Sequence, residues 1–82
     1  MLTKAVIELD AKLSVYPNPV SNVLNIRGID NMNQIEVISV TGSVMKKQLR
    51  SASVDVSDLN RGVYFLKVQT DKAIFTTRFM KD

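Results

Sequence analysis

The chain has 82 residues, of which 45% are hydrophobic and 23% are charged. That length corresponds to one small domain, and the composition is that of a globular protein rather than a disordered one. The sequence contains no cysteine and no histidine, which excludes disulfides, thiolate chemistry and the usual histidine base or metal ligand. No apolar run approaches the ~20 residues that a membrane-spanning helix needs.

The charge is unevenly placed along the chain. Residues 1–43 carry three basic and four acidic side chains, whereas residues 44–82 carry eight basic and four acidic ones. The basic bias of the second half favours an acidic partner, although a solvated sheet face has the same pattern.

Apolar and polar residues alternate along most of the chain, which is the period-two pattern of β-strands. A first strand or an extended linker is predicted from Ala5 to Asp10. Seven further strands are predicted at Leu13–Tyr16, Val23–Arg27, Gln34–Val40, Val44–Leu49, Val54–Val56, Val63–Gln69 and Ala73–Met80. Short strands about ten residues apart, separated by turns, indicate an all-β sandwich.

Pro17 and Pro19 flank Asn18 directly after the strand that ends at Tyr16. Neither proline donates a backbone hydrogen bond, and each restricts the residue before it to extended geometry. The segment therefore predicts a stiff corner. It is interpreted either as protection of a sheet edge or as a pre-shaped epitope for a receptor.

The stretch Leu59–Phe65 predicts a turn that leads into a strand. Gly62 is expected at positive φ, where a Cβ would clash. Tyr64 is placed like the tyrosine of a Greek-key corner, whose hydroxyl bonds to nearby backbone while its ring fills the core. Gly42 is expected in a hairpin turn. Leu59, Gly62, Tyr64 and Gly42 are therefore interpreted as residues that specify the fold.

Two acidic residues, Asp55 and Asp58, lie on either side of Ser57. Carboxylates of this kind can ligate calcium. A turn closed by hydrogen bonds from an aspartate side chain is the preferred interpretation, because no denser acidic loop surrounds them.

A basic pair, Arg78 and Lys81, lies near the C-terminal end. In a strand, Arg78 and Met80 share one face, and Phe79 and Lys81 share the other. Lys81 lies beyond the last apolar residue, so its ammonium group is expected to be exposed. The pair is interpreted either as a solubilising terminus or as a charge that a partner reads.

Taken in chain order, these segments resemble the type A C-terminal sorting domain of type IX secretion, the Por secretion system sorting domain family. The resemblance runs from about Leu13 to Lys81. It is carried by Leu13–Pro19, Leu24–Ile26, Thr41–Gly42, Asp55–Ser57, Leu59–Phe65 and the basic end of the chain. The chain departs from the family's basic end by placing Asp82 after the lysine.

The resemblance implies an immunoglobulin-like, Greek-key-like sandwich in a single domain at residues 13–82, with residues 1–12 as a linker remnant or first edge strand. It implies an upstream cargo domain, passage through the periplasm, and recognition by the outer-membrane translocon and by periplasmic or surface shuttle components. A sortase-like cysteine protease would then remove the domain as the cargo is anchored at the cell surface or released. The residues implied in recognition are Pro17, Asn18, Pro19, Arg78 and Lys81.

The sorting hypothesis predicts that Lys81→Ala, or loss of the last few residues, leaves the fold intact but blocks export. The alternative is a carbohydrate- or protein-binding sandwich module of an extracellular enzyme, with Tyr16 and Phe75 as its available aromatic residues. No nucleotide, serine-elbow or nucleic-acid motif is present, so no enzymatic activity, cofactor, metal or nucleic-acid partner is predicted. Two open sheet edges permit a weak homodimer.

Overall fold

The computed structural model describes residues 7–8 and 13–82. This part of the chain forms strands and turns, and none of it is a helix long and apolar enough to cross a membrane. Its strands are β1 (Ile7–Glu8), β2 (Ser14–Tyr16), β3 (Val23–Arg27), β4 (Gln34–Ser39), β5 (Val44–Leu49), β6 (Ser53–Asp55), β7 (Gly62–Gln69) and β8 (Ile74–Lys81).

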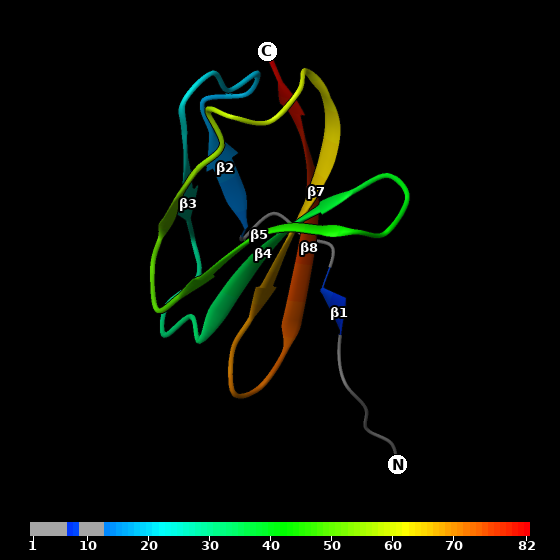
Figure 1. The fold of residues 1–82 in the computed structure, drawn as a ribbon. Helices are drawn as coiled ribbons and strands as arrows, with labels where there is room; N and C mark the ends of the chain where they lie inside the picture. The colour runs from blue at the N-terminus through cyan, green and yellow to red at the C-terminus, as the bar shows by residue number, and fades with distance from the viewer. Residues whose placement is uncertain (1–6, 9–12) are drawn as a thin grey trace.

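The strands form two sheets, which confirms the predicted all-β sandwich (Figure 1). The larger sheet has the order β1-β8-β7-β4-β5, and the smaller sheet has the order β2-β3-β6. Strands β2 to β8 pair antiparallel within their sheets, while the two-residue β1 pairs parallel with β8. The chain changes sheets after β1, after β3, after β5 and after β6, and such connections between two packed sheets are like those of immunoglobulin-like folds.

The core lies between the two sheets and is built by the predicted alternation. In β3, β4 and β7 every second side chain is buried, because successive residues of a strand point to opposite faces of the sheet. The buried hydrophobic cluster consists of Leu13, Val20, Leu24, Ile26, Ile29, Ile35, Val37, Val54, Val56, Leu59, Tyr64, Leu66, Val68 and Phe79.

Tyr64 joins the start of β7 to the turn before it, as the corner pattern predicts. Its hydroxyl donates a 2.7 Å hydrogen bond to the Asn60 carbonyl, and its ring stacks on Phe79 with 5.9 Å between centroids. Gly62 has φ +150°, and a Cβ added there would meet no atom within 4 Å. The expected clash is therefore absent, and it is the backbone conformation at Gly62 that disfavours other residues.

The turn between β4 and β5 contains Gly42 at φ +94°. The Gly42 amide donates a 2.9 Å hydrogen bond to the Ser39 carbonyl, which closes the predicted hairpin. Figure 1 shows this hairpin extending sideways from the sandwich. Strand β5 is the outer strand of the larger sheet, and five of its six residues are exposed.

The opposite edge of the larger sheet is formed by β1, where Ile7 pairs with Ile74 and Glu8 with Phe75. The strand or linker predicted from Ala5 to Asp10 lies outside the described residues except at these two positions.

Candidate recognition site at the C-terminal strand

The Pro17–Pro19 corner begins where β2 ends at Tyr16. Both prolines follow cis peptide bonds, and Pro17, Asn18 and Pro19 are all exposed. The next residue, Val20, is fully buried and forms an isolated parallel bridge with Lys81. The corner therefore returns the chain directly to the side of β8.

Polar contacts join this corner to the last residues of the chain, 62 positions away. The Asn18 side-chain oxygen accepts a 2.9 Å hydrogen bond from the Met80 amide. The Val20 amide donates to the Met80 carbonyl, and the Asp82 amide donates to the Val20 carbonyl, both at 2.9 Å. The Ser21 hydroxyl lies 3.3 Å from an Asp82 carboxylate oxygen. We call these contacts the terminal clamp.

The expectation that Lys81 is exposed is wrong, because the residue retains only 8% of its accessible surface. Alternation along β8 turns Lys81 to the same side as the buried Phe79, and the bridge to Val20 covers it. Its Nζ donates a 3.0 Å hydrogen bond to the main-chain oxygen of Asp82. The long aliphatic stem of a lysine can be buried while the ammonium group keeps a polar partner.

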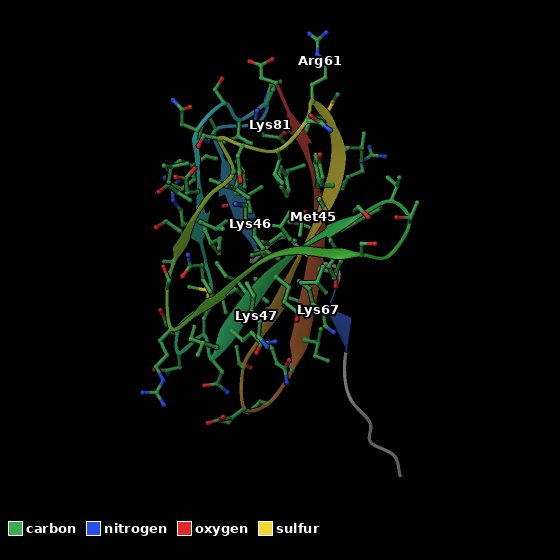
Figure 2. All side chains as sticks on the ribbon, viewed as in Figure 1. Met45, Lys46, Lys47, Arg61, Lys67 and Lys81 are labelled. Carbon is green, nitrogen blue, oxygen red and sulfur yellow. The ribbon has the colours of Figure 1, made fainter. Side chains whose placement is uncertain are left out.

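Arg78 has the opposite orientation. It is exposed and pairs in register with Phe65 of β7, on the face of the larger sheet that points away from the core. The predicted sharing of faces, Arg78 with Met80 and Phe79 with Lys81, is confirmed. Figure 2 shows Lys81 at the upper end of the molecule, whereas the labelled Arg61 extends outward from that end.

The five recognition residues predicted from the sequence therefore fall into two groups. Pro17, Asn18, Pro19 and Lys81 gather at the terminal clamp, where Val20 and Met80 supply the backbone partners. Arg78 lies apart from them on the outer sheet face.

The clamp residues Val20 and Ser21 were missed by reasoning from the sequence. The available signal was an isolated apolar residue, Val20, directly after Pro19 and outside any predicted strand. It does not identify the partner, since the bridge joins segments that are far apart in the chain.

The two aromatic residues expected for a binding face do not form one. Phe75 is half-buried and packs against the core cluster. Tyr16 is exposed, but the Arg27 guanidinium lies 4.4 Å from its ring centroid and occupies that side of the ring. A hollow at the other end of the sandwich is lined by no aromatic residue; its lining consists of residues 30–33, 50–52 and 70–72.

Asp55 and Asp58 are held by local partners. The Ser57 amide donates a 2.8 Å hydrogen bond to Asp55, which confirms the predicted aspartate turn. Asp58 forms a 2.7 Å ion pair with Lys46 of β5. Hydrogen bonds from Ser57 lower the pKa of Asp55, and the hydrogen bond from Lys46 lowers the pKa of Asp58. Across residues 7–8 and 13–82, no group of three or more acidic residues is placed to hold a metal ion.

Comparison with known proteins identifies the family of this sandwich. Residues 14–82 match the family model described as secretion system C-terminal sorting domain. The chain is also 40% identical over 58 residues to Beta-agarase D of Zobellia galactanivorans, and that match covers 70% of this chain and 12% of the agarase. Residues 14–82, which match the family model, contain β2 to β8, the corner at Pro17–Pro19 and the terminal clamp. The chain therefore belongs to the C-terminal sorting domain family of the type IX secretion system.

Proposed function

We propose that this domain directs an upstream cargo protein through the outer-membrane type IX translocon by protein–protein recognition. The observation that carries the proposal is the terminal clamp, which holds Met80 against Asn18 and Val20, and Asp82 against Val20 and Ser21. A C-terminal signal held in this way presents one fixed surface to a receptor, and such preorganisation reduces the entropy lost on binding.

The two groups of recognition residues have different parts in this proposal. Lys81 holds Asp82 through its hydrogen bond to the Asp82 main-chain oxygen, and Asn18 holds Met80. Pro17 and Pro19 stiffen the corner that carries Asn18. Arg78, which is exposed, contacts the receptor directly. The two cations of the C-terminal region therefore act differently: Lys81 is held in the terminal clamp, and Arg78 is accessible to the receptor.

The proposal includes the route of the cargo. The cargo reaches the periplasm, where shuttle components bind the domain at residues 13–82. After translocation a sortase-like cysteine protease cleaves between cargo and domain, in or before the linker or edge segment of residues 1–12, and the cargo is anchored at the cell surface or released. The relatedness to part of an agarase is consistent with a hydrolase as cargo.

The test is a fusion of residues 1–82 to the C-terminus of a fluorescent reporter that carries an export signal, in a host with type IX secretion. We expect this reporter at the cell surface or in the medium, and the reporter without the domain in the periplasm. If the folded fusion also stays in the periplasm, the family relationship is one of fold only for this chain. Intact-mass analysis of the surface reporter tests cleavage, since a cleaved reporter lacks most of the 82 residues.

Deleting Arg78 to Asp82 is an unsuitable control, contrary to the expectation that loss of the last residues leaves the fold intact. The deletion removes Phe79, which stacks on Tyr64 and retains 1% of its accessible surface. Loss of a buried phenylalanine side chain costs about 3–5 kcal/mol, against a total stability of about 4–12 kcal/mol for a domain of this length. Point substitutions at exposed residues separate folding from recognition.

A further inference from the structure

The outer face of the larger sheet carries a row of side chains that the strand register brings together. Ile38 of β4 lies opposite Phe65 of β7, and Phe65 lies opposite Arg78 of β8. On its other side, directly after a register shift in the β4–β5 ladder, Ile38 lies opposite Val44 of β5, which is exposed. Directly opposed residues of antiparallel strands point to the same face and have Cβ atoms in reach of each other. One row across four strands is therefore apolar at three positions and cationic at the fourth.

The next row extends the apolar surface on β7 and β8. Val63 lies opposite Met80, two residues along from Phe65 and Arg78, so both side chains share the outer face. Met80 retains 49% and Val44 retains 53% of their accessible surface, while Ile38, Val63 and Phe65 are half-buried. We call Ile38, Val44, Val63, Phe65, Arg78 and Met80 the outer-face patch. A contiguous apolar patch of this kind on a small domain is typical of an interaction site.

The charges beside the patch are mainly positive. The adjacent row places Lys47 and Lys67 on either side of Glu36, so across β4, β5, β7 and β8 these two rows hold three cations, with Arg78, and one carboxylate. The Lys67 Nζ lies 3.9 Å from Glu36, which leaves Lys47 and Arg78 as exposed cations that form no ion pair within the described residues. Figure 2 shows Lys47 and Lys67 on this part of the molecule.

We propose that the outer-face patch is a docking surface for an acidic protein partner, whose apolar side chains cover Phe65 and Met80 and whose carboxylates pair with Arg78 and Lys47. This inference rests on the proposed sorting function and specifies the surface and the chemistry of the receptor. The smaller sheet packs on the opposite face of the larger one, so a partner can approach without any rearrangement of the core.

A protein partner fits this face better than a lipid surface or a second copy of the chain. Recognition of anionic lipid headgroups is typical of clusters of about 4–8 basic residues, and here two cations are available beside side chains that are half-buried. A second copy would bring the same positive face against itself, and opposed like charges destabilise an interface.

The test places the photo-crosslinking residue p-benzoylphenylalanine at Met80 in the exported reporter fusion of residues 1–82. The matched control places it at Val23, an apolar residue of the smaller sheet that retains 43% of its accessible surface. Each fusion is also made with Arg78→Glu, and with Lys72→Glu as the same change of charge in the distant turn between β7 and β8. Unfolding of every variant is measured by circular dichroism.

We expect a protein adduct from position 80 but not from position 23, with an acidic surface identified at the crosslinked segment by mass spectrometry. Arg78→Glu should reduce that adduct and the exported fraction by about tenfold, because it puts a carboxylate opposite carboxylates. Lys72→Glu should leave both within about twofold of the parent.

Three results would overturn the inference: equal crosslinking from positions 80 and 23, an adduct with lipid or with a second copy, or an Arg78→Glu fusion that crosslinks and exports like the parent. The parent fusion separates this inference from the proposed function. If the parent stays in the periplasm, the sorting proposal fails and this inference fails with it. If the parent and Arg78→Glu are exported to the same extent, only the docking surface is wrong.

Discussion

The two faces of β8 differ in what they contact and in how much of each side chain solvent reaches. On the inner face, Phe79 stacks on Tyr64 and Lys81 is covered by the bridge to Val20. On the outer face, Arg78 and Met80 are exposed beside Phe65. The same strand thus completes the fold with one set of side chains and leaves the other set accessible to the partner that we propose. Substitutions on the two faces should therefore have separable effects on stability and export.

The largest expected effect is that of Phe79→Ala on the inner face. Removing this ring leaves a cavity between the sheets and abolishes its stacking on Tyr64, so we expect the free energy of unfolding to fall by about 3–5 kcal/mol. Urea unfolding followed by circular dichroism measures the loss. A loss below about 1 kcal/mol would show that the inner face of β8 is not part of the core.

The second effect separates the stem of Lys81 from its charge. Lys81→Ala removes most of a buried aliphatic stem and should cost about 2 kcal/mol. Lys81→Met keeps a side chain of similar length, so its cost should stay below about 1.5 kcal/mol. The comparison uses the unfolding midpoints of both variants in urea. Equal stability of the two variants would contradict the packing of Lys81 against the clamp.

A smaller effect is expected for Asn18→Ala, which removes the acceptor of the Met80 amide. We expect a loss of about 1 kcal/mol and faster hydrogen exchange at Met80. Asn22→Ala is a suitable control, because its side chain forms no contact in the terminal clamp. Unchanged exchange at Met80 in Asn18→Ala would show that this bond does not hold the strand in solution.

The smallest expected effect is the loss of stability at low pH that comes from Asp55 and Asp58. The pKa values of Asp55 and Asp58 are below the ordinary value of 3.8 in the folded chain. The contribution of these two carboxylates to the free energy of unfolding is therefore present above their pKa in the unfolded chain. It is lost as pH falls through their pKa in the folded chain. We expect the urea midpoint to decrease from about pH 4 downward. Asp55→Asn should weaken the dependence of the urea midpoint on pH while keeping the hydrogen bond from the Ser57 amide. An unchanged pH profile would show that Asp55 does not contribute to the loss of stability in acid.

Much of the fold follows from features that act over short range. Alternation in β3, β4 and β7 identifies the buried faces because the period of a strand is fixed by its backbone. The placement of Tyr64 two residues after Gly62 predicts the corner, since the two partners of its hydroxyl bond, Tyr64 and Asn60, are only four residues apart. The agreement of local pattern with burial in these strands is the consistency that a folding sequence requires.

The sites that were not predicted depend on contacts between distant segments. The burial of Lys81 requires Val20 to lie beside it, and the position of Lys81 in the sequence, after the last apolar residue, suggests exposure instead. The outer-face patch depends on the register of four strands, and a shift by one residue would turn Phe65 and Arg78 to the other face. Neither arrangement can be obtained from a motif of a few residues.

The central claim is that the inner face of β8 maintains the fold, while the outer face is recognised by the export machinery. The most direct test measures the exported fraction of the reporter fused to residues 1–82 or to its Arg78→Glu variant, together with the free energy of unfolding of each domain. We predict free energies of unfolding that differ by no more than the usual effect of a surface substitution, about 0.5 kcal/mol, and an exported fraction about tenfold lower for the variant than for the parent. Equal export of the two fusions would contradict the claim.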